Sequence, residues 1–374
     1  MYERTRMHII FDERNRLPKQ IMHTNLIKSR TIPPLHAAIA MAATVVAAIL
    51  SLLSCGGEKE EKEQLFDPGC YPYAVRHGDN YYFIRQADNT KNITITTTTD
   101  LTRVADGKSK QVWPLGGKKA DTDIWSPELH YIKGKWYIYF EADDGNTDNH
   151  EIYVLENTAA TPTEGTFRLK GAVRTNAEWN FGIHPTTFTV GGRQYLVWSG
   201  WPKRRSDAET QCIYIAAMSN PWTVSSDRVL ISQPTYEWER QWINPDGTRS
   251  AYPIYVNENP TVTMSRDGSR VIVYYSASGC WTPYRCEGMV WADAKANLLD
   301  SRSWHKHSEP VLKATPSDSI CGPNNVCFVE SGDNDRPYML YETMTSQRTG
   351  GYQKQIRLKT IGYDHDGMPV LGKP

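Results

Sequence analysis

One unit of sequence occurs five times along this chain, and no other feature constrains the fold as strongly. Each unit has a proline, an apolar strand, a glycine turn and a second strand rich in Tyr and Trp, followed by a third, as in "HPTTFTVGGRQYLVWSGW…QCIYIAAMSNP". The five prolines are Pro72, Pro127, Pro185, Pro260 and Pro323. Repeats of this size with several strands each are typical of propeller blades. An irregular β-sandwich would not repeat the same ordered unit, so the sequence predicts an all-β chain folded as a five-bladed β-propeller.

The residues around these prolines are expected to converge at one end of a central channel. In a propeller the first strand of each blade lines that channel. A concave place with convergent polar groups is the default binding site. The interval between Pro185 and Pro260 also holds "TYEWERQWINPDGTRSAYPIY". Its Trp, Tyr and Arg residues suit contacts with sugars, although the same residue types also pack propeller blades. The converging set is Tyr71, Ser126, Glu128, His184, Glu258, Asn259, Gly322 and Asn325.

The first part of the chain has the features of a targeting segment. Residues 36–53, "HAAIAMAATVVAAILSLL", form a long apolar run that leads into Ser54-Cys55 and a charged stretch. This order predicts a lipoprotein signal peptide over residues 1–54, for which Met22 is a better start than Met1. A transmembrane anchor is the alternative. Residues 55–65 predict a charged, disordered tether, and residues 66–374 the propeller domain. We expect an exported lipoprotein, attached to the outer membrane through lipidated Cys55 and facing the periplasm or the cell surface.

Charge and cysteine usage exclude several classes of partner and site. The formal net charge is zero and the sequence pI is about 7.1, so nothing suggests a nucleic-acid surface. Six cysteines follow Cys55, and the pairs Cys280/Cys286 and Cys321/Cys327 have neither zinc-site spacing nor paired histidines. They are expected to be structural thiols or to form one or two disulfides, which export permits. We expect a monomer without a catalytic metal.

Several motifs, in order along the chain, resemble glycoside hydrolase family 43. They are "IWSPELHYIKGKWYIYF", "YLVWSGW", "IYIAAMSNPWT", "VNENPTV" and "VYYSASGCWT". The resemblance covers about Gly69 to Pro374 and is strongest to the arabinofuranosidase-like branch. It implies a five-bladed propeller that removes arabinofuranosyl, xylosyl or galactosyl units from plant or host glycans with inversion. Inversion needs an acid that protonates the leaving oxygen and a base opposite that activates water.

Only one of the family's three catalytic carboxylates has a counterpart here. The resemblance places Glu258 of "VNENP" at the general acid and His184 of "GIHPTT" at the aspartate that tunes the acid. It places Tyr71 of "CYPYAV" at the general base, and a rival alignment through "FDPGC" makes Asp67 the base. Asn325 stands where many members have a channel histidine near a bound cation, which weakens the implied structural calcium site.

Further residues carry roles that the resemblance or their position implies. Glu128, Trp125, Trp201 and Asn325 are expected to contact the substrate, together with Tyr71. Glu128 has an equally good interpretation as a structural residue. Asp123, just upstream of Trp125, is a candidate for a relocated base.

Two hypotheses follow from these residues. The first is a glycosidase that uses Glu258 as acid and a non-standard base, with an oligo- or polysaccharide as substrate. The second is a propeller that has lost catalysis and binds glycans through the same funnel. A titratable group opposite Glu258, about 6.5–9.5 Å away, would distinguish the two.

Overall fold

The computed structural model describes residues 63–66, 68–113, 120, 122–177, 180–203, 209–248, 253–315, 318, 320–332, 336–346 and 352–374. The chain divides into Met1–Lys59 and Glu60–Pro374, and the described residues all belong to the second unit. The predicted signal peptide, Cys55 and most of the tether lie outside the described residues. No helix in the described part of the chain is long and apolar enough to span a membrane.

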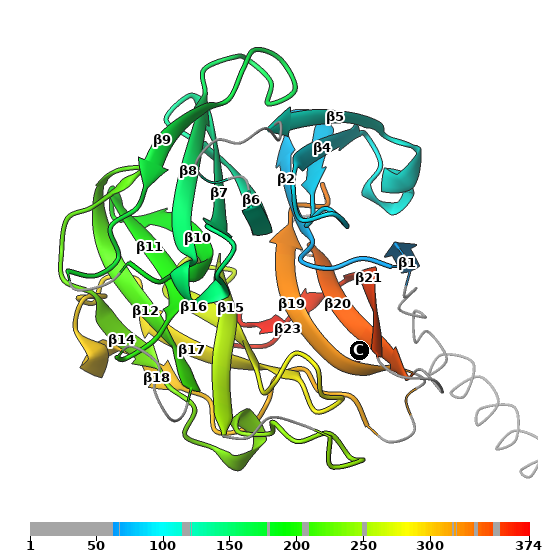
Figure 1. The fold of residues 1–374 in the computed structure, drawn as a ribbon, viewed down its shortest axis with the longest axis vertical. Coiled ribbons are helices and arrows are strands. Elements are labelled where there is room, and N and C mark those ends of the chain that lie inside the picture. The colour runs from blue at the N-terminus through cyan, green and yellow to red at the C-terminus, as the bar shows by residue number, and fades with distance from the viewer. Residues whose placement is uncertain are drawn as a thin grey trace, which may run out of the picture. The chain divides into compact units, whose positions relative to one another are not determined.

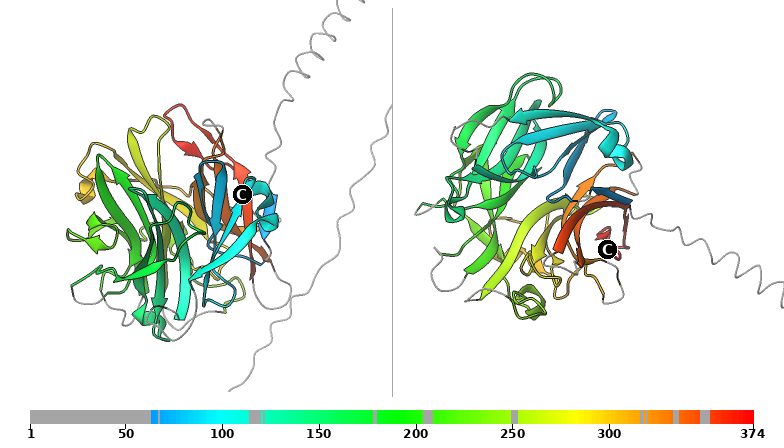
Figure 2. Two further views of the ribbon diagram at one scale, coloured as in Figure 1. Left: turned by 90° about the horizontal axis from the view of Figure 1, so that it is seen from above. Right: turned by 45° about the vertical axis from the view of Figure 1, so that its right-hand side comes forward.

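Antiparallel sheets make up the second unit, in chain order around a common centre (Figures 1 and 2). The first contains β2 (Tyr73–His77), β3 (Asn80–Ile84), β4 (Ile93–Thr98) and β5 (Lys108–Trp113). The second contains β6 (Thr122–Ile132), β7 (Lys135–Asp143), β8 (Glu151–Asn157) and β9 (Arg168–Ala172). The third contains β10 (Ile183–Val190), β11 (Arg193–Gly200), β12 (Glu209–Asn220), β13 (Thr223–Val224) and β14 (Val229–Ser232).

The fourth sheet contains β15 (Ile254–Met264), β16 (Arg270–Ala277), β17 (Cys286–Asp293) and β18 (His305–Lys306). A short parallel pairing of β12 with β15 joins it to the third. The fifth contains β19 (Cys321–Val329), β20 (Tyr338–Ser346), β21 (Tyr352–Thr360) and, from the other end of the chain, β1 (Glu63–Phe66). The hairpin of β22 (Gly362–Tyr363) and β23 (Pro369–Val370) follows. Short 3-10 turns are η1 (Leu101–Asp106), η2 (Thr147–Asn149), η3 (Glu237–Glu239) and η4 (Ser301–Ser303).

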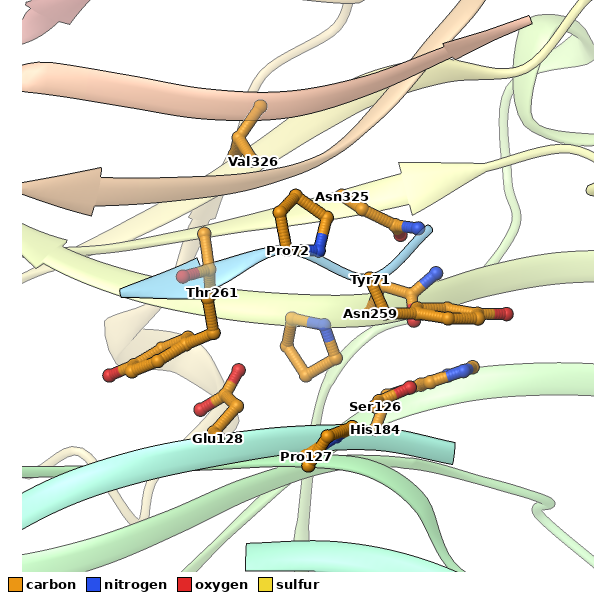
Figure 3. Close-up of a pocket in the computed structure, with 12 residues that line it drawn as sticks. Tyr71, Pro72, Ser126, Pro127, Glu128, His184, Asn259, Thr261, Asn325 and Val326 are labelled. Carbon is orange, nitrogen blue, oxygen red and sulfur yellow. The ribbon is translucent and has the colours of Figure 1, made fainter. Parts of the chain in front are cut away.

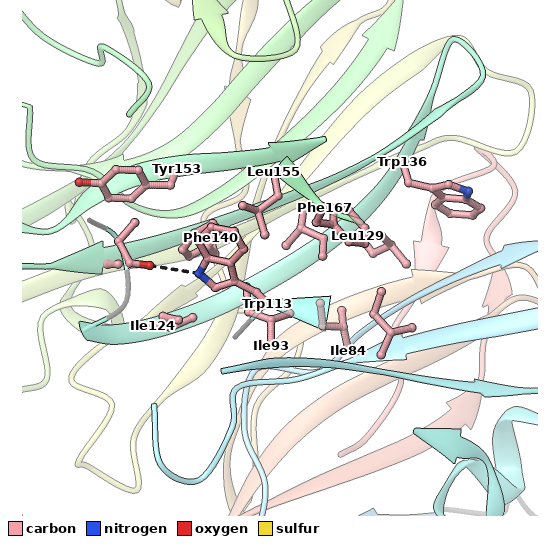
Figure 4. Close-up of a cluster of buried hydrophobic side chains, with 14 of the residues drawn as sticks. Ile84, Ile93, Trp113, Ile124, Leu129, Trp136, Phe140, Tyr153, Leu155 and Phe167 are labelled. Atoms are coloured by element: carbon pink, nitrogen blue, oxygen red, sulfur yellow. Dashed lines mark hydrogen bonds between the residues drawn. The ribbon is translucent and has the colours of Figure 1, made fainter. Parts of the chain in front are cut away.

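The innermost strands close a ring. Contacts run from β2 to β6, to β10, to β15, to β19 and back to β2. Each pair of neighbouring sheets also encloses its own apolar cluster. Figure 4 shows the cluster between the first two sheets, where Ile84, Ile93 and Trp113 face Leu129 and Phe140. The all-β prediction is confirmed, and the chain folds as a β-propeller of five sheets.

Strand periodicity explains why the middle strands are apolar on both faces. On β7, Ile138 and Phe140 join the cluster toward the first sheet, and Tyr137 and Tyr139 join the cluster toward the third. Successive side chains of a strand point to opposite faces, so a strand between two blades has no solvent face. The hairpin between β10 and β11 turns at Gly191 and Gly192, both with positive φ, as the predicted Gly-Gly turn requires.

The sequence placed the start of the propeller at residue 66, but the strand that completes the fifth sheet begins at Glu63. Its backbone pairs with β21, with Glu63 opposite Leu358 and Phe66 opposite Ile356. The end of the predicted tether is therefore part of the sheet, because β21 would otherwise present an unpaired edge. All six described cysteines are free thiols, so the disulfide alternative is wrong for this structure.

We predict that Phe66→Ala destabilises the propeller by about 2 kcal/mol. The Phe66 ring is partly buried, and its removal leaves a gap between β1 of the fifth sheet and the first sheet. Phe66 stacks on Phe83 with ring centroids 5.3 Å apart. Chemical denaturation measures the change. Glu63→Ala is the matched control, since exposed Glu63 contributes to β1 through its backbone. Equal effects of both substitutions would contradict the prediction.

Candidate active site

The first strand of every sheet enters the channel through a residue with left-handed backbone. These residues are Tyr71 (φ 50°), Ser126 (41°), His184 (52°), Asn259 (50°) and Asn325 (53°), and we call them the left-handed ring. All five line one pocket, shown in Figure 3. Non-glycine residues rarely adopt positive φ, and each one costs about 1–3 kcal/mol. Five equivalent strained positions at one point of the channel identify it as the place where function is to be sought.

A β-bulge accompanies each of the four paired ring positions. On β15, Glu258 pairs with Ser276 and Thr261 pairs with Tyr274. Three residue steps on β15 therefore correspond to only two on β16. The same shift occurs on β6, β10 and β19. A bulge re-aims the side chains beside it. Four ring residues precede a proline, but the fifth, Asn325, precedes Val326, so Pro323 is not the counterpart that the repeat suggested.

Glu258 immediately precedes the ring and is fixed by a buried arginine. Its Oε1 lies 2.6 Å from Nη2 of Arg285, and the two side chains are 8% and 1% exposed. Arg285 also donates from Nη1 to the Ser278 carbonyl and from Nε to Oδ1 of Asn324, both at 2.9 Å. Burial lowers the pKa of Arg285, but the Glu258 carboxylate outweighs this and the pKa is raised. The guanidinium therefore remains charged and holds Glu258 in one orientation.

His184 lies between two glutamates. Its Nδ1 is 3.9 Å from Oε2 of Glu258 and its Nε2 is 3.7 Å from Oε1 of Glu141. The Tyr71 ring stacks on the imidazole with centroids 5.3 Å apart. Burial, and then the charge of Arg285, lower the pKa of His184 well below its usual value. The imidazole is therefore neutral near pH 7 and can accept a proton at one nitrogen while donating from the other.

Tyr71 occupies its ring position through a second charged pair. Its backbone N–H donates to Oε2 of Glu342 at 3.2 Å, and Lys354 lies 3.0 Å from Oε1 of the same carboxylate. Lys354 also sits 5.0 Å from the centre of the Tyr71 ring. Burial raises the pKa of Tyr71 well above its usual value. Tyr71 is therefore a contact and packing group rather than a proton acceptor at neutral pH.

The other predicted contact residues lie in different surroundings. Glu128 is two residues past the ring and pairs with His130 at 3.0 Å, and in Figure 3 its carboxylate lies on the opposite side of the pocket from the Tyr71 and His184 rings. Trp125 stacks on His150 with centroids 4.0 Å apart. Trp201 is buried face to face against Phe181, with centroids 3.8 Å apart. The pocket thus brings together Tyr71, Glu128, His184 and Asn325, and Glu258 lies beside His184 without being one of the lining residues.

Of the two alternative bases, only Asp123 is among the described residues. Asp123 accepts a hydrogen bond from the Thr90 hydroxyl at 3.2 Å and does not line the pocket. Asp67 lies outside the described residues. Both candidates remain predictions, and no contact of Asp123 with Glu258 is found in the described part of the chain.

The calcium site that the resemblance implied fits these residues poorly. Asn325 donates from Nδ2 to Glu342 at 2.9 Å, and its Oδ1 accepts from the Ser276 hydroxyl at 3.2 Å. Glu342 is already neutralised by Lys354. Calcium prefers six to eight oxygen ligands, several of them carboxylates. Within the described ranges no group of three His, Cys, Asp or Glu residues could hold a metal ion.

The loop rich in aromatic residues is hydrogen-bonded to β15, the strand that carries Glu258. Glu239 in η3 accepts from Nδ2 of Asn257, the neighbour of Glu258, at 3.0 Å and from the backbone N–H of Tyr236 at 2.8 Å. Lys306 lies 2.5 Å from the same carboxylate. Trp238 stacks with Tyr236, centroids 5.9 Å apart, and donates to the Ser308 carbonyl. The fully buried Glu239 therefore connects this loop to the position of Glu258.

Four residues of the site are not predicted from the sequence: Arg285, Glu141, Glu342 and Lys354. Glu141 and Glu342 lie on second strands, opposite the residues that precede the ring. A charged residue inside an otherwise apolar strand, as in "YIYFEA" and "YMLYET", is the signal that could have found them. Nothing local marks Arg285, because its partner is distant in sequence.

A β-propeller with buried carboxylates and a neutral histidine at one point of its channel is a protein with an acid–base site. The chain belongs to the glycosyl hydrolases family 43, whose family model matches residues 70–369. The resemblance noted in the sequence is therefore confirmed.

Two curated relatives are named extracellular exo-α-(1→5)-L-arabinofuranosidases. The protein of Streptomyces avermitilis is 33% identical over 315 residues, which cover 81% of this chain and 61% of that protein. The protein of Streptomyces chartreusis is 34% identical over 276 residues, covering 72% of this chain and 78% of its own. This chain thus spans about three fifths of the length of the first. The crystal structure of an α-L-arabinofuranosidase from Lactobacillus brevis superposes with a TM-score of 0.72 at 27% identity, covering 83% of this chain and 95% of that one.

We predict that Arg285→Met destabilises the protein by about 3–5 kcal/mol at pH 7, because it leaves the Glu258 charge buried without a partner. In a Glu258→Gln background the same substitution costs much less, since no charge is stranded. A double-mutant cycle from denaturation curves measures the coupling. Equal costs in the two backgrounds would show that Arg285 acts through packing alone.

Glu287 gives a second prediction, on pH. Burial raises the pKa of Glu287 from 4.5 to about 8, although the Ser276 hydroxyl, which donates to it at 2.8 Å, opposes the shift. Between these two values the native state binds more protons than the unfolded state, so this group makes stability fall as pH rises. Glu287→Gln removes this pH dependence. Its free energy of unfolding, relative to that of the wild type, should therefore rise between pH 5 and pH 8 by a few kcal/mol, since a pKa shift of one unit corresponds to about 1.4 kcal/mol. Thermal unfolding at several pH values tests this. An advantage independent of pH would contradict it.

Proposed function

We propose that this protein is a glycoside hydrolase that releases arabinofuranosyl units from arabinose-containing glycans. The single observation that carries the proposal is the position of Glu258, buried next to the left-handed ring and oriented by Arg285 in a chain of family 43. The names of the two Streptomyces relatives support the choice of sugar and an exo-acting mode. Xylosyl and galactosyl units are the next candidates, as the resemblance implies.

In this proposal Glu258 protonates the oxygen of the leaving group. An acid at this point must be held in place and must have a source of protons. Arg285 supplies the orientation at 2.6 Å, and the neutral His184, at 3.9 Å, is a group that can pass a proton to Glu258. The reaction is inverting by analogy with the family, with water attacking the anomeric carbon from the opposite face.

The base is not one of the ring residues. His184 is 3.9 Å from Glu258, whereas an inverting pair is separated by about 6.5–9.5 Å to leave room for water. Tyr71 has its pKa raised, first by burial, and is no acceptor. Glu342 is engaged by Lys354 at 3.0 Å. We propose Asp67 as the base because the "FDPGC" alignment provides it.

A glycan-binding protein without catalysis is the second candidate, and one observation favours it. Tyr71, which takes the family's base position, is stacked on His184 and fixed through its own backbone to Glu342. A site in which an aromatic ring replaces the base can still hold a sugar.

The proposal includes export. We propose that lipidated Cys55 attaches the protein to the outer membrane, so that a monomeric propeller meets oligo- or polysaccharides outside the cytoplasm. The two relatives that are extracellular by name support export, and the lipid rests on the Ser54-Cys55 sequence alone.

We predict that the purified protein hydrolyses aryl α-L-arabinofuranosides and arabino-oligosaccharides. Glu258→Gln should slow the oligosaccharides by about 10²–10⁴-fold, because it removes the proton donor. Asp67→Asn should slow both kinds of substrate, because it removes the group that activates water. Initial rates and the anomer first released, observed by NMR, are the measurements.

Asp123→Asn is the matched control for a carboxylate that does not line the pocket, and its activity should be close to that of the wild type. If neither wild type nor Glu258→Gln turns over any substrate, but both bind the same glycan in calorimetry, the protein is a glycan-binding propeller.

A further inference from the structure

Glu141 is a buried carboxyl that the proposed reaction has not yet used. It lies on β7 opposite Trp125, immediately behind the left-handed ring, and its side chain is fully buried. Neither of its oxygens has a hydrogen-bond partner of good geometry among the described residues, although the Ser126 hydroxyl and the His184 backbone N–H face the carboxyl. Its one ion-pair contact in that part of the chain is with Nε2 of His184, at 3.7 Å.

The equivalent positions in other sheets show that packing alone does not require a glutamate here. Second strands carry Ser199 opposite Ile183 and Ser276 opposite Glu258, both much smaller. The fifth sheet does carry a glutamate, Glu342, but Lys354 neutralises it at 3.0 Å. A buried carboxyl without a cation is expensive to retain in the charged form. Glu141 is therefore the unusual member of the set, and the imidazole of His184 is what it faces.

Glu141, His184 and Glu258 form a chain in which one imidazole bridges two carboxyls through its two nitrogens. The two gaps, 3.7 and 3.9 Å, are slightly longer than hydrogen bonds. Hydrogen bonds of a catalytic site are often long without substrate and shorten when it binds. All three side chains are at most 8% exposed, so bulk water does not interrupt the chain.

The surroundings favour one arrangement of protons at rest. Burial raises the pKa of Glu141 well above its usual value, against the effect of the Ser126 hydroxyl and the His184 amide that face it, and Glu128 adds to the rise. Burial lowers the pKa of His184, as do Arg285, His150 and Lys354, while Tyr71 covers its ring. Glu141 then carries a proton and His184 is neutral. With Glu141 donating to Nε2, the ring proton is on Nδ1 and faces Glu258.

We propose that Glu141 is a positioning residue that stores a proton and delivers it, through His184, to Glu258 during departure of the leaving group. This inference rests on the proposed function and deepens it. It resolves a conflict in the site, since Glu258 is paired with a permanent cation, Arg285, yet has to act as an acid. Because Glu141 stores the proton, Glu258 can remain a carboxylate between turnovers.

The transfer is balanced in protons. Water attacks the anomeric carbon and gives a proton to the base, while the bond from that carbon to the glycosidic oxygen breaks and this oxygen takes a proton from Oε2 of Glu258. Glu258 takes the Nδ1 proton of His184, and Nε2 takes the carboxyl proton of Glu141. Glu141 is left as a carboxylate and His184 remains neutral with its proton on Nε2. After the product leaves, a solvent proton enters at Glu258 and Nδ1, and the Nε2 proton returns to Glu141.

The first test compares two leaving groups in Glu141→Gln. An arabino-oligosaccharide needs a proton donor, whereas a dinitrophenyl arabinofuranoside departs without one. We expect kcat on the oligosaccharide to fall at least about tenfold, a part of the 10²–10⁴-fold that general acids supply, and the alkaline limb of its pH profile to move to lower pH. The activated substrate should change less than about twofold. Glu287→Gln, which also removes a buried carboxyl of raised pKa, is the matched control and should show no such selectivity. Equal slowing of both substrates by Glu141→Gln, or none, would overturn the proposal.

The second test does not depend on activity and so separates this inference from the proposed function. Nitrogen NMR of the wild type, with His184 assigned from the spectrum of His184→Asn, should show a neutral ring protonated on Nδ1 at pH 7. Infrared difference spectra should show a protonated carboxyl that disappears in Glu141→Gln. A ring protonated on Nε2 or on both nitrogens, or an ionised Glu141, would refute the proton store even in an active enzyme. If both spectra agree but no glycoside is hydrolysed, the proposed function is what fails.

Discussion

The left-handed ring is the constraint on which the site depends. Five sheets deliver Tyr71, Ser126, His184, Asn259 and Asn325 to one point of the channel in the same strained conformation. A bulge at this place turns four of the five strands, so that the residue before the ring, such as Glu258, still pairs with the second strand while the ring residue faces the pocket. The strain is tolerated because it is distributed over five sheets whose interfaces bury their apolar faces on both sides.

Charge at this point is arranged in pairs, each formed within one sheet. Glu258 of the fourth sheet meets Arg285 from the loop before β17, and Glu342 meets Lys354 across the fifth. A buried charge is tolerated only with a partner and further hydrogen bonds, and these pairs have both. Arg285 also donates to Asn324, which precedes a ring residue, and Glu342 also accepts from the backbone of Tyr71, which is one. The charged pairs therefore fix the ring as well as each other.

The sequence predicted the architecture and all five ring members, because strand periodicity and the recurring proline are local patterns. It did not predict Glu141, Glu342, Arg285 or Lys354, whose roles depend on pairings between segments that only the folded sheets bring together. It also grouped Trp201 with the substrate contacts, since a tryptophan in "WSGW" looks the same in sequence whether it faces a sugar or, as here, Phe181. Pro323 misled the register of the fifth sheet because an additional shift on β19 separates it from the ring.

If His184 takes the acid-tuning position, as the resemblance implies, a histidine there acts on the acid with the opposite sign to an aspartate. A carboxylate near the acid favours its protonated form, whereas a protonated imidazole would favour the carboxylate. The structure avoids the second case by burying His184 close to Arg285, which keeps the ring neutral. A neutral ring alone has no net proton to give. The buried carboxyl of Glu141 on its far side provides one, so a histidine and a glutamate from neighbouring sheets can together perform what a single aspartate performs by charge.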